Sequence, residues 1–501
     1  MPAELSKVMS LGIVDYLEDQ FTKPKTGYTG FRRYQNLAPD DCRTLVNDPT
    51  SPSSLCARDN YTLFEMQRQF FANAMNGEDQ LRQRMAFALS QIFVISGTEI
   101  KNAYAMSTYQ NMLLDDAFGN FRDVMEHVTL HPAMGIYLDM LNNDKANPLK
   151  GTKPNENYAR EFMQLFTIGT EQLNLDGTPR LDADGEPLAT YTQQDVEALA
   201  RVFTGWTYSV WPGQTSKWTN APKLHGQLAA VDSHHDTDPK LFLGASLPGG
   251  QTAVTDMNLA LDVIFTHPNV GPFIATRLIQ SFVTSNPSPA YVARVARVFN
   301  NNGMGVRGDL QAVLRAIFFD AEARGQKSDS AYGKLKEPAL FMTGFLRALG
   351  GTSDGVFLRA QSAAMGQDIF TAPSVFNYYS PTHRIGDGTL KGPEFQIFNG
   401  VTTLARIDFV YQIVYGDGAA ADKTVVNSTG TSLSFADAAT VYANAQVASE
   451  LDARMMYGKL SDASYKSVTD ALAALAPDDI EGRARAAAYV LGVSAQYQVQ
   501  R

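Results

Sequence analysis

Residues 78–97, EDQLRQRMAFALSQIFVISG, are apolar on nearly every side of a helix. A helix of that kind is buried in a core rather than laid on a surface. Gly97 is a typical residue for its end. The stretch therefore predicts a central helix around which the rest of the chain packs.

Most of the chain repeats its apolar residues at helical spacing, and alternating strand patterns are few. Two Asp-Gly turns within residues 170–192 predict one small hairpin. Further helices are predicted at 131–143, 154–169, 192–207, 265–283, 288–303, 309–320, 336–351, 450–475 and 482–498.

The predicted fold class is mainly α: a single large helical domain with long irregular loops and at most small β-hairpins. No low-complexity linker divides the sequence, so one domain is expected over residues 1–501. It is expected to comprise central helices at 61–206, a Trp/His-rich loop at 207–255, a helical body with polar loops at 256–416, and C-terminal helices at 435–501.

Composition excludes several classes of protein. Hydrophobic residues make up 44% of the 501 and charged residues 19%, as in a globular protein. The net charge of -10 and the lack of a basic stripe argue against nucleic acid as a partner. No apolar run approaches the roughly 18 to 20 residues of a membrane span.

The two cysteines, Cys42 and Cys56, flank a segment rich in Pro, Ser and Asp. A disulfide that staples this loop is expected if the protein is exported, and two reduced thiols if it is cytosolic. The opening MPAELSKVMSLG lacks the apolar core of a signal peptide, so an exported protein would be a trimmed form.

All three tryptophans fall within residues 206–218, WTYSVWPGQTSKW. Such clustering indicates a functional loop or a loop with a small core of its own. Just downstream, His235 and Asp236 lie in a run of His and Asp that would suit a divalent metal ion. The spacing fits no standard zinc motif, so a polar surface loop is the alternative.

Two predicted helices carry candidate carboxylates. Glu161 lies beside the apolar stripe of its helix, where it could act chemically or pair with Arg84 or Arg201. Asp195 shares a face with Leu199, but with Thr192 it also has the spacing of a helix capping box. Both alternatives stay open for each residue.

Several segments occur in a familiar order. They are LRQRMAFALSQIFVIS at 81–96, NENYAREFMQLFTIG at 155–169, YTQQDVEALARVFTGW at 191–206, HHDTDPKLFLG at 234–244, APSVFNYYSP at 372–381 and GPEFQIFN at 392–399. Together they resemble the bacterial family known as "domain of unknown function 1800". The resemblance covers nearly the whole chain.

The resemblance implies a mostly helical, exported protein, and it strengthens the expectation of a Cys42–Cys56 disulfide. It also implies a partner, an exported protein of the "domain of unknown function 1501" family, which is similar to sulfatases and alkaline phosphatases. Family members usually begin with a signal peptide and an ATFGPT-like segment, which this sequence lacks. The family has no established reaction and so assigns no catalytic residue.

The leading hypothesis is a periplasmic or secreted hydrolase that acts on extracellular carbohydrate or a related polymer. Glu161 would be the acid/base, with Asp195 or Asp236 as the second carboxylate. His235 and Asp236 would hold a metal ion, or His235 would carry protons. The residues expected to bind substrate are Arg160, Trp206, Asn377, Tyr378, Glu394 and Gln396. The alternatives are a non-enzymatic scaffold or partner subunit, and a metal-binding or redox protein.

Overall fold

The computed structural model describes residues 3–31, 52–325, 331–436 and 446–501. The buried helix expected at 78–97 is α5 (Gln80–Ile92), which ends five residues early. Phe93, Val94 and Ile95 continue as buried chain outside any helix. Gly97 is needed there for close packing, because a side chain at this position would collide with Leu63.

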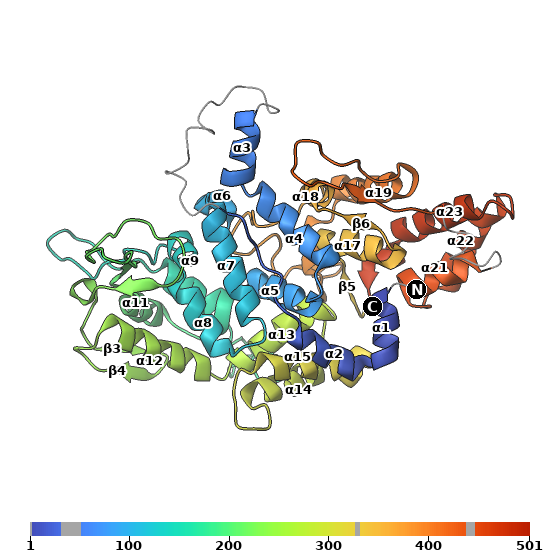
Figure 1. Ribbon diagram of the computed structural model, residues 1–501. Helices are drawn as coiled ribbons and strands as arrows, with labels where there is room; N and C mark the ends of the chain where they lie inside the picture. Colours follow the sequence, from blue (N-terminus) through green and yellow to red (C-terminus); the bar gives the residue numbers. More distant parts are fainter. Residues whose placement is uncertain (1–2, 32–51, 326–330, 437–445) are drawn as a thin grey trace.

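Helices dominate the first half of the chain (Figure 1). They are α1 (Ala3–Leu11), α2 (Ile13–Thr22), α3 (Pro52–Tyr61), α4 (Phe64–Asn76), α5, α6 (Gly97–Ile100), α7 (Ala103–Asp116), α8 (Phe121–Leu130), α9 (Pro132–Tyr137), α10 (Asn157–Glu161), the π-helix η2 (Phe162–Thr167) and α11 (Gln193–Val202).

The second half is also mainly helical. Its helices are η3 (Asp232–His234), α12 (Ala253–Thr266), α13 (Val270–Phe282), α14 (Pro289–Asn300), α15 (Leu310–Phe319), α16 (Ala321–Arg324), α17 (Pro338–Leu349), α18 (Val356–Ala364), η4 (Pro393–Ile397), α19 (Gly400–Tyr415), α21 (Val447–Met456), α22 (Asp462–Ala473), α23 (Ile480–Val493) and α24 (Ala495–Gln498).

The strands form only two-stranded antiparallel sheets. The pairs are β1 (Trp206–Tyr208) with β2 (Leu228–Ala230), β3 (Lys240–Phe242) with β4 (Ala245–Leu247), β5 (Lys334–Leu335) with β10 (Val499–Gln500), β6 (Thr352–Ser353) with β9 (Thr431–Ser432), and β7 (Arg384–Ile385) with β8 (Leu390–Lys391). The mainly α fold class is therefore confirmed. Isolated antiparallel bridges also fold residues 170–192 back on themselves, as the Asp-Gly turns predict.

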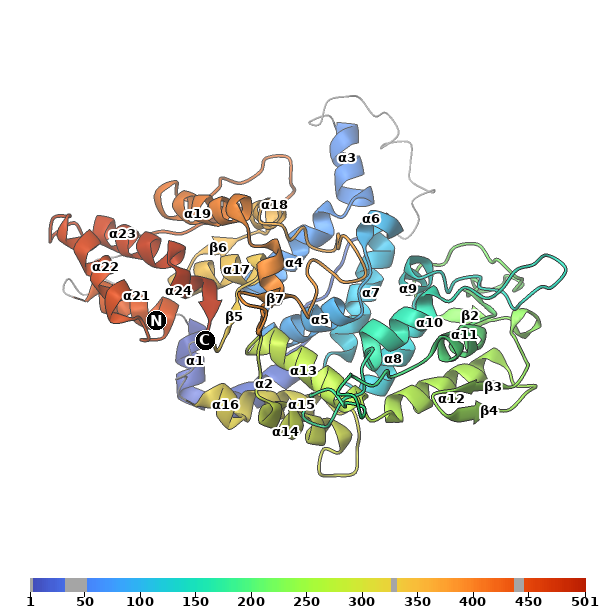
Figure 2. The same ribbon diagram turned by 180° about the vertical axis from the view of Figure 1, so that it is seen from behind.

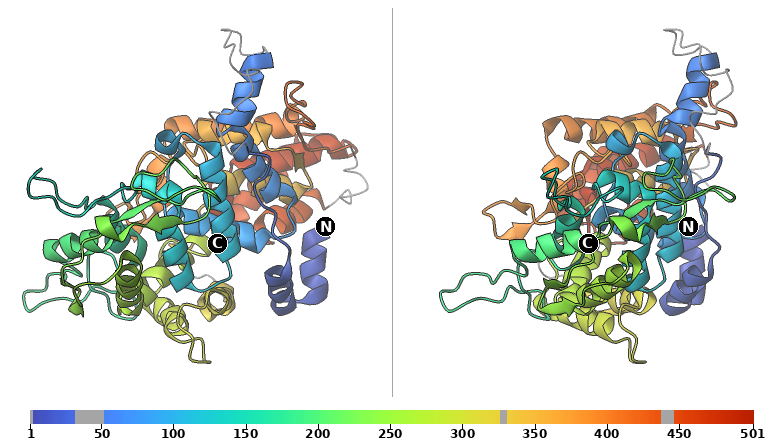
Figure 3. Two further views of the ribbon diagram at one scale, coloured as in Figure 1. Left: turned by 60° about the vertical axis from the view of Figure 1, so that its left-hand side comes forward. Right: turned by 90° about the vertical axis from the view of Figure 1, so that its left-hand side faces the viewer.

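α5 and α13 lie between two groups of helices, one made by α8, α11 and α12 and the other by α17 to α23 (Figures 1 and 2). One cluster of buried side chains runs through both groups. The pair β5–β10 ties the C-terminal end to the middle of the chain, through Val499↔Leu335. Long loops leave the helical body on several sides (Figure 3).

The helix expected at 154–169 is split. α10 passes into the π-helix η2 after Glu161, where Thr167 Oγ1 donates to the Phe162 carbonyl at 2.6 Å. The element ends at Gly169, which has the expected left-handed conformation with φ 73°. Across the described residues, no helix is both long and apolar enough to cross a membrane.

Candidate functional site

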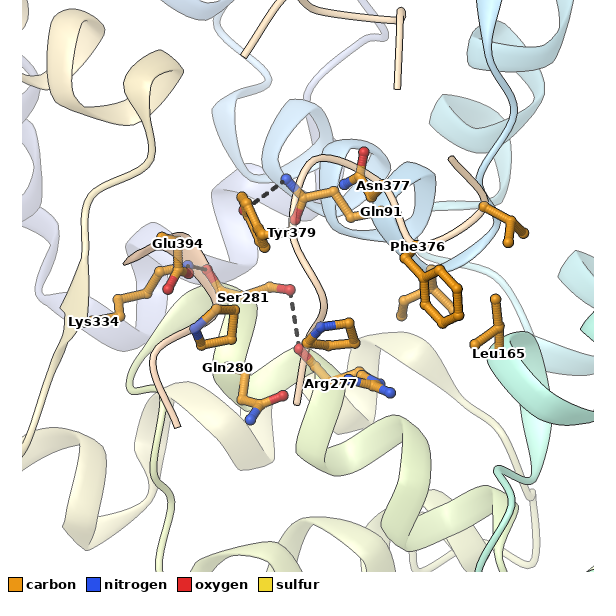
Figure 4. Close-up of a pocket in the computed structure, with 14 residues that line it drawn as sticks. Gln91, Leu165, Arg277, Gln280, Ser281, Lys334, Phe376, Asn377, Tyr379 and Glu394 are labelled. Carbon is orange, nitrogen blue, oxygen red and sulfur yellow. Dashed lines mark hydrogen bonds and ion pairs between the residues drawn. The ribbon is translucent and has the colours of Figure 1, made fainter. Parts of the chain in front are cut away.

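A cavity of about 60 Å³ opens between α5, α13, β5 and the loops at 371–381 and 392–399 (Figure 4). We call it the deep cavity. It has room for a few water-sized atoms, such as those of one carboxylate or sulfate group. The lining residues are Gln91, Ile92, Leu165, Arg277, Gln280, Ser281, Lys334, Val375, Phe376, Asn377, Tyr379, Pro381, Pro393 and Glu394.

The loop at 371–381 forms one wall because of its backbone conformation. Asn377 is left-handed, with φ 68°, which asparagine tolerates better than most residues. The turn buries Asn377 while Phe376 stays 47% exposed, and both line the cavity. Among the described residues the Asn377 side-chain amide has no hydrogen-bond partner, so it is free to bind a ligand.

A buried ion pair forms another wall. Lys334 Nζ lies 3.1 Å from Glu394 Oε1 and donates to the Ser281 carbonyl at 3.0 Å. Glu394 Oε2 is buried and has no partner within the described part of the chain. Burial raises the pKa of Glu394, Lys334 opposes this, and nearby Glu337 adds to it. A carboxyl group with a raised pKa can hold and deliver a proton.

Glu337 organises the floor behind this pair. Its Oε2 accepts hydrogen bonds from Gln91 at 2.7 Å, Gln367 at 2.6 Å and Tyr379 at 2.8 Å. The three donors come from α5 and from residues after α17, so one carboxylate holds several segments together. Because its donors are already in place, Glu337 is a positioning group rather than a proton donor.

Arg277 brings an uncompensated positive charge to the cavity. Within the described residues its guanidinium makes no ion pair or hydrogen bond, and it lies 4.9 Å from the centroid of the Phe273 ring. Burial lowers the pKa of Arg277 to about 10. Burial and the charge of Arg277 also lower the pKa of Lys391. The local excess of positive charge favours an anionic ligand.

A second hollow of about 290 Å³ adjoins the first, and Val375 lines both. We call it the outer hollow. Its other lining residues are Ser96, Thr98, Glu99, Tyr137, Leu138, Asp139, Asn157, Ala372, Pro373 and Ser374. Hydroxyl, amide and carboxylate groups of this kind can hydrogen-bond sugar hydroxyls.

Glu161 lies close to Tyr137, which lines the outer hollow. Its charge reaches Tyr137, and it comes four residues before Leu165 of the deep cavity. Its Oε2 is buried without a partner in the described structure, and burial raises the pKa of this carboxyl against the opposing charge of Arg160. No hydrogen bond or ion pair joins Glu161 to Asp195, His235 or Arg84 in these ranges.

Two of the four residues expected in polar loops line the deep cavity, namely Asn377 and Glu394. The other two stabilise the loops. Tyr378 donates to the Asp368 carbonyl at 2.6 Å, and Gln396 Oε1 accepts from the Ser380 amide at 2.7 Å.

Asp195 has the capping role that its spacing allows. It forms a capping box with Thr192, and its Oδ1 accepts from the Leu243 amide at 2.7 Å. Burial acts to raise the pKa of Asp195, but these hydrogen bonds outweigh it and lower the pKa. Arg160 pairs with Glu156 at 2.8 Å, as its spacing in the helix suggests. Neither residue lines the cavities described above.

His235 and Asp236 do not fit a metal ion in this arrangement. His235 Nδ1 lies 3.0 Å from the Thr204 carbonyl and Nε2 lies 3.1 Å from Asp256, so neither nitrogen is open to a metal. The two carboxylate oxygens of Asp236 accept hydrogen bonds from Nε and Nη2 of Arg201, each at 2.8 Å. Among the described residues no group of three or more His, Cys, Asp or Glu could hold a metal ion.

The tryptophan cluster serves mainly to fold its own loop. Trp206 is 2% exposed and starts β1, so its ring face is not presented to a ligand. Trp218 stacks on His234 with ring centroids 4.1 Å apart, and Trp211 lies 5.0 Å from His225. The loop therefore has the small core that was one of the two expectations.

Sequence reasoning missed Arg277, Lys334, Glu337 and Tyr379. Arg277, Gln280 and Ser281 follow helical spacing, so a polar edge on the apolar segment 265–283 was the one available signal. Lys334 and Glu337 lie just before the start of α17 and belong to no recognisable sequence motif, so nothing in the sequence marked them.

The fold and the two hollows define a mainly helical protein with a charged, partly buried cavity. The chain belongs to the family described as "Protein of unknown function (DUF1800)", whose model matches residues 1–499. It matches no curated protein and no solved structure. Cys42 lies outside the described residues, so the disulfide with Cys56 stays a prediction, which a mass map of unreduced peptides would test.

Proposed function

We propose that the protein is an exported hydrolase of acidic polysaccharide, with Glu394 as its proton donor. One observation carries the proposal: Glu394 Oε2 is buried beside the deep cavity and has no partner among the described residues. The raised pKa of this carboxyl suits general acid catalysis.

The charges support an anionic substrate. Arg277 would bind a carboxylate or sulfate substituent in the deep cavity, which is too small for a sugar ring. The sugar itself would lie in the outer hollow, against residues such as Asp139 and Asn157. This division extends the hypothesis of a carbohydrate substrate, made from the sequence, to an acidic carbohydrate.

In the reaction, the glycosidic oxygen would lie where the two hollows meet, at Val375. The proton on Glu394 passes to this oxygen as the carbon–oxygen bond breaks. A water molecule adds to the sugar carbon and gives its proton to a second carboxylate. Exchange with solvent then returns Glu394 to its protonated form and that carboxylate to its charged form. Glu161 is the second carboxyl with a raised pKa and is the candidate base for that water. Lys334 and Glu337 act through Glu394 as positioning residues.

The test measures new reducing ends from polygalacturonate and hyaluronate, with neutral amylose as the control polymer. We expect cleavage of at least one acidic polymer and a loss of 100-fold or more in Glu394→Gln. Asp470→Asn, an exposed surface change, is the matched control. Full activity in Glu394→Gln, or cleavage of amylose alone, would contradict the proposal.

Export and a partner of the "domain of unknown function 1501" family rest on the family resemblance alone. Fractionation of the native cells, followed by affinity purification from the extracytoplasmic fraction, tests both. Recovery of the protein only from the cytoplasm would contradict the proposed export.

A further inference from the structure

A third cavity, larger than the other two, lies between α4, α5, α17, the end of α21 and β10. We call it the basic cavity. Its volume is about 860 Å³, in the range of sites that hold small molecules. It shares no lining residue with the deep cavity, so it is a separate site.

The charged residues that line the basic cavity are all positive. They are Arg84, Lys336, Arg347, Arg454, Lys459 and Arg501. Within the described ranges no aspartate or glutamate lines it. A concave wall with charge of one sign concentrates ligands of the opposite sign.

Lys336 is the best-placed cation. Its Nζ lies 3.5 Å from the centroid of the Tyr497 ring and makes no ion pair or hydrogen bond within the described chain. The acid next to it in sequence, Glu337, faces away and already accepts from Gln91, Gln367 and Tyr379. Burial, together with the charge of Arg406, lowers the pKa of Lys336 to about 7.

Two guanidinium groups close to Lys336 bond to uncharged acceptors, whereas Arg454, farther along the wall, lies 4.0 Å from Glu450. Arg84 donates to the Ser281 carbonyl, at 3.4 Å. Arg406, which lies just behind the cavity wall, donates to Gln498 Oε1 at 2.8 Å and to the Lys336 carbonyl at 2.9 Å. Burial lowers the pKa of Arg84 and Arg406 by more than the charge of Glu337 raises it, so a bound anion would stabilise this buried positive charge.

The rest of the lining is largely apolar. Phe70, Phe87, Met455, Met456 and Tyr497 are all buried by other parts of the fold and still border the cavity. An inorganic anion would leave the cavity-facing atoms of these side chains uncovered, whereas a hydrocarbon chain would pack against them.

We propose that the basic cavity binds an amphiphilic anion, with a carboxylate or phosphate head at Lys336 and Arg84 and a hydrocarbon chain along the apolar wall. The sequence could not indicate this site, because its residues come from five segments spread between Phe70 and Arg501.

Gly344 of α17 allows a test that separates binding from folding. A side-chain carbon added there meets only the Tyr497 hydroxyl, at 3.8 Å, so a larger residue would grow into the cavity. Replacing a helical glycine generally stabilises the helix. Gly344→Leu should therefore fold well and fill the site, and Gly344→Ala is the matched control. Lys336→Met removes the charge but keeps the apolar stem.

Calorimetric titration of the full chain with oleate, dodecyl phosphate, methyl oleate and inorganic phosphate gives the readout. We expect oleate or dodecyl phosphate to bind, and the tighter one identifies the head group. Methyl oleate should bind at least 10-fold more weakly than oleate. Lys336→Met should weaken binding of the preferred anion at least 10-fold, Gly344→Leu should abolish it, and Gly344→Ala should leave it within 2-fold.

Three results would overturn the proposal. The first is that neither amphiphile binds the wild-type protein. The second is that inorganic phosphate binds as tightly as dodecyl phosphate. The third is unchanged binding in both Lys336→Met and Gly344→Leu, while their melting temperatures show that both are folded.

Discussion

The region around His235 and the region around the deep cavity are both rich in polar residues. They differ in whether these side chains bond to one another. Around His235, the side chains bond to one another: Asp256 accepts from both His235 and Lys240, and Arg201 holds Asp236. Around the deep cavity, Glu394 keeps one oxygen without a partner and Arg277 keeps its whole guanidinium free, within the described residues.

The difference shows that a high density of His and Asp in the sequence does not by itself mark a site. The His235 region uses its groups to fix a loop against α11 and α12, whereas the cavity leaves groups free at the cost of some stability. Substitutions in the first region should therefore cost stability, and substitutions in the second should cost function.

Asp256→Ala should give the largest loss of stability. It would leave Lys240, only 2% exposed, and His235, fully buried, without their shared carboxylate. Breaking a buried ion pair by removing one partner costs about 3 to 5 kcal/mol. The loss in the free energy of unfolding is measured by chemical denaturation monitored by circular dichroism. A loss below about 1 kcal/mol would mean that this network contributes little to the fold.

Asp195→Ala should cost less, about 1 to 2 kcal/mol, because it removes one half of the capping box with Thr192 and the bond to the Leu243 amide. Polymer cleavage, measured in the same preparation, should stay within 2-fold of wild type. A large loss of activity in a folded Asp195→Ala protein would return this carboxylate to the catalytic hypothesis.

Compared with wild type, the Glu394→Gln variant should become more stable as the pH rises. A raised pKa means that the folded protein holds this proton more tightly than the unfolded chain, so Glu394 destabilises the fold as the pH rises above 4.5. The glutamine cannot ionise, and its amide oxygen can still accept from Lys334. Relative to wild type, the variant should become more stable between pH 4.5 and pH 8. Urea denaturation at the two pH values measures this change, and a loss of relative stability would contradict the raised pKa.

Arg277→Gln should have the smallest effect on stability, within about 0.5 kcal/mol, since no described ion pair is lost. Binding of galacturonate should nevertheless fall at least 10-fold, as measured by calorimetry. Arg180→Gln, at an exposed position that lines neither hollow, is the control. Equal binding by both variants would remove Arg277 from the site.

The helical fold could be predicted from the sequence because periodicity and caps act locally. His131, expected at a helix start, is the cap of α9, and its Nδ1 accepts from the Ala133 amide at 3.1 Å. The end of α5 could not be predicted. It depends on Gly97 meeting Leu63 and Phe370, which are distant in sequence.

The candidate site could be predicted only in part. Asn377 and Glu394 lie in short polar loops, whose composition suggests a pocket. Their partners come from segments far away along the chain, such as Gln91 in α5 and Arg277 in α13. Whether a carboxylate is saturated or free depends on such distant neighbours, and for that reason Asp195 and Glu161 could not be separated by their sequence patterns.

The state of the Glu394 carboxyl tests the central claim most directly. Infrared difference spectra between wild type and Glu394→Gln isolate this one group across a pH titration. The structure predicts a protonated carboxyl band that disappears with a midpoint above 4.5, the ordinary value for glutamic acid. A midpoint at or below 4.5 would show that the Lys334 ion pair dominates, and Glu394 would then be no proton donor.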